Sequence, residues 1–142
     1  MAKISIYLNF PGTTEEAFNF YKSVFGSDFS SPIARMGSIP KQEGMPELSD
    51  EDKNKVMHVA LPIMNGVEIM GTDNLPSMGH RTTIGNNTTI SLEPDTREET
   101  TRIFNLLSEG ASDLAPLQEQ FWGAIWGCCL DKYGIRWMLS CR

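Results

Sequence analysis

Apolar and polar residues alternate at the start of the chain, which predicts a strand over residues 4–10. One face of this strand is apolar and consists of Ile4, Ile6, Leu8 and Phe10. The other face carries Ser5, Tyr7 and Asn9. After a Pro11-Gly12 turn the apolar residues change to helical spacing. This second pattern predicts an amphipathic helix over residues 14–25 that ends at Gly26 and packs on a sheet.

A hairpin is the clearest feature of the first half of the chain. Residues 56–64 and 67–72 have the composition of two strands, and Asn65-Gly66 lies between them. That dipeptide readily adopts the positive φ angles of a two-residue type I′ turn. A shorter strand is expected over residues 31–37. Residues 38–55 are polar and interrupted by Pro and Gly, which indicates a loop.

The order of elements then repeats. Thr13 and Glu16 precede the first helical pattern with the spacing of a capping box, in which the threonine hydroxyl and the glutamate satisfy free N–H groups. Thr96 and Glu99 have the same spacing 83 residues later, and they follow a predicted strand over residues 88–93. A second amphipathic helix should follow and end at Gly110. An internal repeat of this size predicts two copies of one structural unit.

Three further strands are expected near residues 112–119, 122–130 and 135–141, with a turn held by Asp131 and Gly134. The chain therefore predicts an α+β fold of two strand–helix–three-strand modules in a single domain over residues 1–142. The modules should span about 3–73 and about 87–142. One helix would cover one face of each sheet, and the opposite faces would curve around a cleft.

Charge and composition narrow the range of partners. Lys and Arg total 12 against 18 Asp and Glu, a net charge of −6, and the basic residues form no stripe. This balance argues against a nucleic-acid or anionic-membrane partner. No apolar run reaches the roughly 20 residues of a membrane helix, and no signal peptide is predicted before the first strand. Cys128, Cys129 and Cys141 are expected to be reduced thiols in a cytoplasmic protein.

Motif segments are spread over nearly the whole chain. They are Leu8-Asn9-Phe10-Pro11-Gly12, Glu16-Ala17-Phe18-Asn19-Phe20-Tyr21, Phe25-Gly26, Met57-His58-Val59-Ala60-Leu61, Glu68-Ile69-Met70-Gly71-Thr72-Asp73, Phe121-Trp122-Gly123 and Asp131-Lys132-Tyr133-Gly134 with Trp137. Together they resemble the PhnB-like branch of the glyoxalase/bleomycin-resistance/dioxygenase (vicinal oxygen chelate) superfamily. The block from Phe121 to Trp137 is the most specific part of the resemblance.

The resemblance implies paired βαβββ modules and a homodimer. Members of known chemistry bind a divalent metal through His, Gln or Glu on the first and fourth strands of each module. Those places fall near Ser5 and Met70 in the first module, and near Thr89 and Met138 in the second. None of these side chains is a good ligand for zinc or an octahedral metal, so no divalent metal is expected and the cofactor stays unknown. The branch also carries a demethylubiquinone methyltransferase label, although no Gly-rich loop follows a strand here to hold a methyl donor.

Two polar residues are candidates for catalysis. Strand alternation places His58 and Glu68 on the face away from the helix, and the tight turn is expected to set them roughly opposite one another. A carboxylate beside an imidazole can make a general base or supply two metal ligands. The alternative is a plain cross-strand hydrogen bond in a polar pocket. Glu93 is a third candidate metal ligand on the corresponding face of the second module.

The candidate ligand-binding residues are Tyr7, Arg35, Met70, Gln118, Trp122 and Trp126. Trp122 and Trp126 are expected to share one face of one strand, where an indole can stack on a ligand or fill the core. Arg35 can bind an anion bidentately, or it can be an ordinary surface residue.

Three functions stay open at this point. The first is a glyoxalase-like protein that binds a small molecule without catalysis. The second is a metal-dependent lyase, isomerase or dioxygenase that uses His58 and Glu68. The third is a structural dimer module whose cleft is filled by its own side chains. The sequence does not decide whether the protein is an enzyme.

Overall fold

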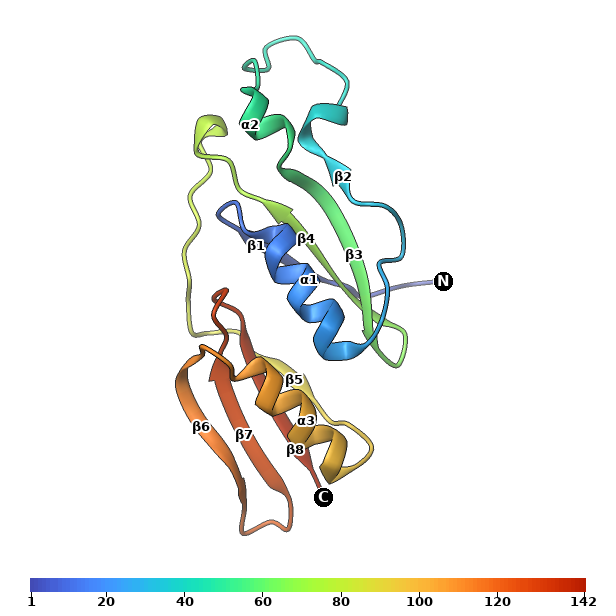
Figure 1. Cartoon of the computed structure of the whole chain (residues 1–142), viewed down its shortest axis with the longest axis vertical. Coiled ribbons are helices and arrows are strands. Elements are labelled where there is room, and N and C mark those ends of the chain that lie inside the picture. The colour runs from blue at the N-terminus through green and yellow to red at the C-terminus, as the bar shows by residue number, and fades with distance from the viewer. The chain divides into compact units, whose positions relative to one another are not determined.

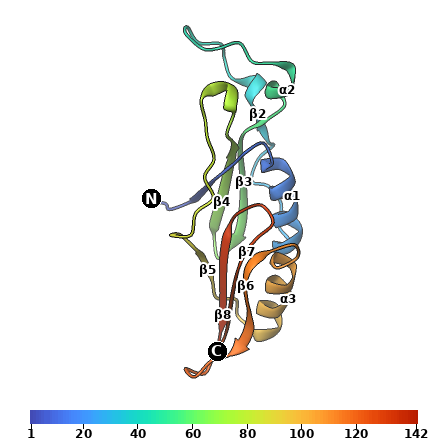
Figure 2. The same ribbon diagram turned by 90° about the vertical axis from the view of Figure 1, so that its left-hand side faces the viewer.

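A computed structural model describes all residues of the chain and divides them into two compact units, Met1–Thr82 and Thr83–Arg142. Each unit contains a four-stranded mixed sheet with a helix packed on one of its faces (Figures 1 and 2). None of the helices combines the length and the apolar composition needed to cross a membrane. The α+β fold expected from the sequence is confirmed.

The first unit contains β1 (Ile6–Phe10), α1 (Thr14–Phe25), β2 (Ala34–Arg35), the 3-10 turn η1 (Met36–Ser38), α2 (Asp50–Lys53), β3 (Val56–Met64), β4 (Val67–Asp73) and the 3-10 turn η2 (Pro76–Met78). Its strand order is β1-β4-β3-β2. The strands β1 and β4 are parallel, and the other pairs are antiparallel.

The second unit contains β5 (Ile90–Leu92), α3 (Arg97–Leu107), β6 (Ser112–Glu119), β7 (Ile125–Leu130) and β8 (Arg136–Cys141). Its order, β5-β8-β7-β6, repeats that of the first unit, and β5 and β8 are again the parallel pair. The sequence repeat therefore corresponds to a structural repeat.

The helix α1 packs closely on its sheet at Gly71. The sheet face beneath the helix includes Val59, Leu61 and Ile69, all of them fully buried. A Cβ atom at Gly71 would lie 2.5 Å from Cε1 of Phe18 on α1, so only a glycine fits at this point. In the second unit the buried Trp137, Leu139 and Cys129 lie beside the buried face of α3, which contributes Ile103, Phe104 and Leu107.

The strand registers determine which side chains lie on the face away from each helix, which we call the open face. Tyr7 pairs with Met70, which pairs with Ala60. Ser91 pairs with Met138, which pairs with Cys128. Along each strand, the residues of these two sets of pairs alternate with the buried residues that face the helix. The predicted assignment of faces is confirmed, including the position of His58 on the side away from α1.

The two helices begin differently, which the sequence did not predict. Thr96 caps α3 as expected, because its hydroxyl accepts the N–H of Glu99 at 3.1 Å. Thr13 makes no side-chain cap, so the first capping box is wrong. The buried carboxylate of Asp73 on β4 takes its place and accepts the N–H of Thr14 at 3.0 Å, its hydroxyl at 2.6 Å and the N–H of Val56 at 2.8 Å.

The predicted turns agree with the structure. Asn65 and Gly66 have φ angles of 49° and 77°, as a type I′ turn requires. Asp131 accepts hydrogen bonds from the N–H groups of Tyr133 and Ile135 and from the indole of Trp137, and Gly134 has a φ of 90°. These contacts confirm Asp131 and Gly134 as the residues that hold the last turn.

Several element boundaries differ from the predictions. The strand expected over residues 31–37 is only the two-residue β2, and the loop at 38–55 contains the short helix α2, which Ser49 caps. The strand β7 begins at Ile125, so Trp122 lies in the preceding turn. The expectation that Trp122 and Trp126 share one strand is therefore wrong.

Candidate functional site

The open face of the first unit brings together an aromatic ring and an imidazole. The rings of Tyr7 and His58 have centroids 6.0 Å apart at an interplanar angle of 34°. Tyr7 is 49% exposed, and His58 and Met70 are half-buried. Of the predicted ligand-binding residues, Tyr7 thus lies beside the predicted catalytic histidine, and Met70 lies beside Tyr7 on the same face.

The expected pairing of His58 with Glu68 is wrong. Glu68 pairs with Pro62 across the hairpin, and the register places His58 opposite Thr72. Pro62 and His58 are separated by four residues on β3, which at about 3.3 Å per residue is about 13 Å. The two-residue Asn65-Gly66 turn pairs Met64 with Val67, so Glu68 lies next to the turn while His58 lies far along β3, and this register already follows from the length of the predicted turn.

Glu68 has other partners instead. Its carboxylate accepts hydrogen bonds from the ammonium group of Lys3 and from the hydroxyl of Ser30. The Lys3 hydrogen bond, followed by that from Ser30, lowers the pKa of Glu68 from its usual value. A carboxylate held in its ionised form in this way is a weak proton acceptor at neutral pH. These contacts give Glu68 a structural role in the first unit.

Arg35 is also engaged. Its guanidinium donates to both carboxylate oxygens of Glu15 on α1, at 2.6 and 3.0 Å, and to the carbonyl oxygen of Asn54 at 3.0 Å. The Glu15 hydrogen bond raises the pKa of Arg35, and the same bond lowers the pKa of Glu15. Because Glu15 already occupies the bidentate edge of the guanidinium, Arg35 joins α1 to β2 and is not arranged to receive an anionic ligand.

The residues at the metal positions of the superfamily do not fit a hard divalent cation. Ser5 and Thr89, the predicted first-strand positions, lie just before β1 and β5. The register instead places Tyr7 beside Met70 in the first unit and Ser91 beside Met138 in the second. Zinc and octahedral metals are bound in proteins mainly by imidazole, carboxylate and thiolate groups rather than by hydroxyls and thioethers. No group of three or more His, Cys, Asp and Glu side chains is close enough together to hold a metal ion.

The open face of the second unit carries the remaining predicted residues. Trp126 on β7 is half-buried and pairs with Gln118 on β6 and with Ser140 on β8. The structure therefore brings Gln118 and Trp126 together in one row across the sheet.

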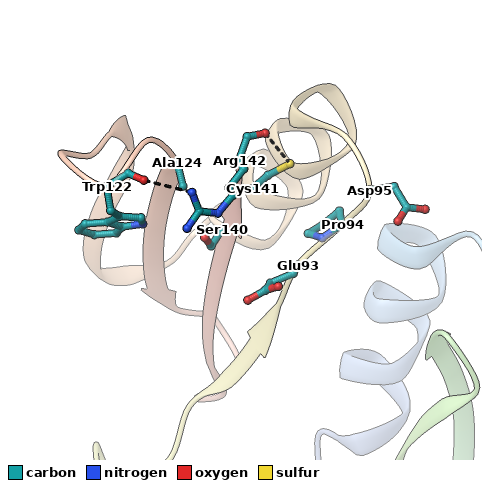
Figure 3. Close-up of a pocket in the computed structure, with 8 residues that line it drawn as sticks. All are labelled: Glu93, Pro94, Asp95, Trp122, Ala124, Ser140, Cys141 and Arg142. Atoms are coloured by element: carbon teal, nitrogen blue, oxygen red, sulfur yellow. Dashed lines mark hydrogen bonds between the residues drawn. The ribbon is translucent and has the colours of Figure 1, made fainter.

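A pocket of about 470 Å³ lies at the end of this sheet (Figure 3). Its lining comes from the chain after β5, from the β6–β7 turn and from the end of β8, and comprises Glu93, Pro94, Asp95, Trp122, Ala124, Ser140, Cys141 and Arg142. Its volume is within the 300–1,000 Å³ range of small-molecule sites. Trp122, a predicted ligand-binding residue, and Glu93, a predicted metal ligand, both line it.

Sequence reasoning missed the contribution of the last residues of the chain to this pocket. Ser140, Cys141 and Arg142 belong to no motif, and alternation alone does not show that β8 ends beside the segment after β5. These residues could have been placed at the pocket only by assuming that the first and fourth strands of each repeat are parallel neighbours. In a parallel pair both strands end at the same edge of the sheet.

The three cysteines have different environments. Cys129 is buried and its thiol lies 3.9 Å from the carbonyl oxygen of Leu107 on α3. Burial raises the pKa of Cys129 to about 11. Cys128 and Cys141 are half-buried, and Cys141 lines the pocket. Cys129 therefore behaves as a small core residue, whereas the Cys141 thiol is open to reagents.

Comparisons with known proteins find relatives that match nearly the whole chain. The model of a family described as 3-demethylubiquinone-9 3-methyltransferase matches residues 2–140. Protein YjdN of Escherichia coli (strain K12) is 31% identical over 96% of this chain and 93% of its own length. Neither description is taken as the activity of this chain.

Solved structures show the same fold. Protein PA1353 from Pseudomonas aeruginosa has a TM-score of 0.82 and 32% identity, covering 100% of this chain and 98% of its own. The putative 3-demethylubiquinone-9 3-methyltransferase, PhnB protein, from Bacillus cereus has a TM-score of 0.77 and 30% identity, covering 99% and 100%. A glyoxalase-related enzyme from Fulvimarina pelagi, with a TM-score of 0.61 and 14% identity over 100% and 89% of the two chains, shares the fold alone.

Proposed function

Since this chain belongs to the PhnB-like family described as 3-demethylubiquinone-9 3-methyltransferase, with a fold of the glyoxalase/bleomycin-resistance superfamily, we propose that it binds a small organic molecule without a catalytic divalent metal. The observation that carries the proposal is the pocket of about 470 Å³ at the end of the second sheet (Figure 3). Pockets that hold small ligands combine an aromatic or apolar wall with a few polar groups. Trp122 supplies the aromatic wall here, and Glu93, Ser140 and Arg142 supply polar groups.

Binding is favoured over metal catalysis by the residues on the open faces. A Tyr7–Met70 pair and a Ser91–Met138 pair offer an aromatic ring, thioethers and a hydroxyl, which are groups that contact an organic ligand. His58 and Glu68, the residues of the metal-dependent alternative, are not opposite one another on the paired strands, and the Glu68 carboxylate is engaged by Lys3 and Ser30.

The name of the family refers to methyl transfer, which would need a site for a methyl donor. The turns from strand to helix here are Pro11-Gly12-Thr13 and Pro94-Asp95-Thr96. Neither has the glycine pattern that lets a helix start cradle a nucleotide-like cofactor after a strand. For this reason our proposal is binding rather than methyl transfer.

The test uses full-length protein purified without an affinity tag. We expect metal analysis after dialysis against chelator-free buffer to find far less than one divalent ion per chain. A screen of small molecules by thermal shift should find compounds that raise Tm. Trp122→Ala should abolish that shift, whereas Trp126→Phe, which lies outside the pocket lining, should retain it. A stoichiometric metal that is lost in His58→Ala would instead support the metal-dependent lyase, isomerase or dioxygenase.

We further propose that the protein is a homodimer in the cytoplasm. Phe121 is 96% exposed at the tip of the β6–β7 hairpin and makes an edge contact with Trp122 at a centroid distance of 4.9 Å, which supports an interaction surface there. Three free cysteines support a reducing compartment. Light scattering should give the mass of two chains, and Phe121→Ser should shift it toward one. A monomeric mass for the parent protein at all concentrations would contradict the dimer.

A further inference from the structure

We propose that the pocket at the end of β8 selects a small zwitterion, a molecule that carries both an ammonium group and a carboxylate. This inference rests on the proposed binding function and names the ligand class. Three features of the pocket support it: the charged side chains of its lining, a difference between the two units at the end of β8, and the indole of Trp122.

The charged groups of the pocket have no ionic partner within the protein. Among the arginines of the second unit, Arg97 pairs with Glu119, Arg102 with Glu99 and Arg136 with Asp113. Arg142 forms no ion pair, and its guanidinium makes only one hydrogen bond, 3.4 Å to the carbonyl oxygen of Trp122 (Figure 3). Its remaining N–H groups are free to bind a carboxylate bidentately.

Glu93 and Asp95 are the acidic residues of the same pocket, and neither is ion-paired. An anionic ligand would meet Arg142 but would be repelled by the Glu93 carboxylate. A cationic ligand would meet Glu93 but would be repelled by the guanidinium. A ligand that carries both charges can pair with each side of the pocket at once, which gives selectivity by attraction and by repulsion.

The two units differ at this corner in a way that explains why the pocket exists. Ile69 on β4 pairs with Ile6, and Trp137 on β8 pairs with Ile90, so the residues four positions later, Asp73 and Cys141, are equivalent. In the first unit the carboxylate of Asp73 fills the corner and binds the N–H groups of Thr14 and Val56.

In the second unit the position equivalent to Asp73 is Cys141, which carries no carboxylate. The thiol of Cys141 bonds only to the carbonyl oxygen of Arg142, at 3.5 Å. Ala124, the counterpart of Val56 by the β7–β8 register, lines the pocket. The carboxylate of a ligand would therefore occupy the space that Asp73 occupies in the first unit, with Arg142 beside it.

The apolar part of the ligand has a defined wall. Trp122 is 41% exposed and lies at one side of the pocket, and Pro94 and Ala124 are buried in its lining. An indole with one accessible face can stack on an aliphatic or aromatic side chain. The pocket thus combines one apolar wall with the positive group of Arg142 and the negative group of Glu93, which suits an α-amino acid with an apolar side chain.

The experiment compares ligands that share one apolar frame and differ only in charge. L-phenylalanine is measured against 2-phenylethylamine, 3-phenylpropionate and 3-phenylpropanol by isothermal titration calorimetry with the full chain. L-leucine is measured against 3-methylbutylamine and 4-methylpentanoate in the same way. We expect at least one amino acid to bind about tenfold or more tightly than every analogue of its frame.

Matched variants locate the binding. Arg142→Gln and Glu93→Gln should each weaken the amino acid about tenfold or more, and each should bring the affinity toward that of the analogue lacking the matching charge. Arg81→Gln and Glu109→Gln remove exposed charges outside the pocket and should leave the affinity unchanged. Circular dichroism and Tm establish that each variant is folded.

The possible results test the proposed ligand class and the proposed binding function separately. If a singly charged or neutral analogue binds as tightly as the amino acid and Trp122→Ala abolishes that binding, the zwitterion proposal is overturned and the binding function stands. If none of these compounds binds, the zwitterion proposal is also overturned. The binding function itself falls only if the thermal-shift screen and native mass spectrometry of the purified protein also find no ligand.

Discussion

At the scale of single residues, Asp73 replaces a cap that the sequence placed on Thr13. We expect Asp73→Ala to lower the free energy of unfolding by about 3 kcal/mol, because three donors lose a charged acceptor in the core. Thr96→Ala should cost about 1 kcal/mol as an ordinary cap. Thr13→Ala is the control and should be nearly neutral. Urea denaturation measures all three, and a loss for Thr13→Ala equal to that of Thr96→Ala would contradict this account.

The thiol of Cys129 gives a second prediction at this scale. Burial raises its pKa to about 11, so at pH 8 about one Cys129 in a thousand is a thiolate. Iodoacetamide at pH 8 should therefore modify Cys141 and Cys128 well before Cys129. Mass spectrometry of peptides at increasing times measures the order, and in denaturant the three rates should converge. Equal rates in the native protein would show that Cys129 is not buried.

The carboxylate of Glu68 should make the thermal stability of the protein depend on pH. Its folded-state pKa is lowered by the hydrogen bond from Lys3 and then that from Ser30, so its contribution to stability is present above its unfolded-state pKa and is lost as pH falls through the folded-state pKa. Glu68→Gln should lower Tm at pH 7, and the difference from the parent should shrink below about pH 4. Thermal melts from pH 7 to pH 3 test this. Glu109→Gln is the exposed control, and a difference that is constant with pH would refute the role of the charge.

At the scale of elements, the distance between α1 and its sheet depends on one missing side chain. A Cβ at Gly71 would lie 2.5 Å from Phe18, which is fully buried and has no room to move. Gly71→Ala should therefore lower the free energy of unfolding by about 1–3 kcal/mol through overpacking. Combining it with Phe18→Leu should cost less than the sum of the two single substitutions. Additive effects in denaturation would indicate that the helix lies farther from the sheet.

The bounds of some helices and strands follow from the sequence, and those of others do not. The helix at 14–25 and the hairpin around Asn65 and Gly66 were predicted with nearly the observed bounds, because periodicity and turn chemistry are local properties. The strand β7 starts three residues later than predicted, because the segment from Gln120 to Ala124 closes as a turn through the hydrogen bond from the Gln120 N–H to the Ala124 carbonyl oxygen. Pattern alone does not separate an aromatic turn from an aromatic strand.

At the scale of the whole molecule, the two units share one topology but differ at one corner. Cys141→Asp would place a carboxylate where Asp73 lies in the first unit. Because this carboxylate would repel the carboxylate of the ligand, it should weaken binding of the amino acid about tenfold or more, whereas Cys141→Ser should leave binding nearly unchanged. Calorimetry with L-phenylalanine or L-leucine measures both variants. Unchanged affinity in Cys141→Asp would show that the ligand carboxylate lies elsewhere.

By itself the sequence determined the strand–helix–three-strand repeat, the faces of the first strand and of the hairpin strands, and the main turns. It did so because alternation, helical spacing and Gly or Asn conformations depend only on neighbouring residues. It also named Trp122 as a candidate for ligand binding and Glu93 as a candidate metal ligand, and both residues line the pocket. Only the tertiary structure decided which residues contact one another. Glu68 contacts Lys3 and Ser30, Asp73 caps α1 from β4, and Arg142 lies at the pocket with Glu93. These contacts join segments that are distant in the sequence, and such contacts are set by packing over many residues at once.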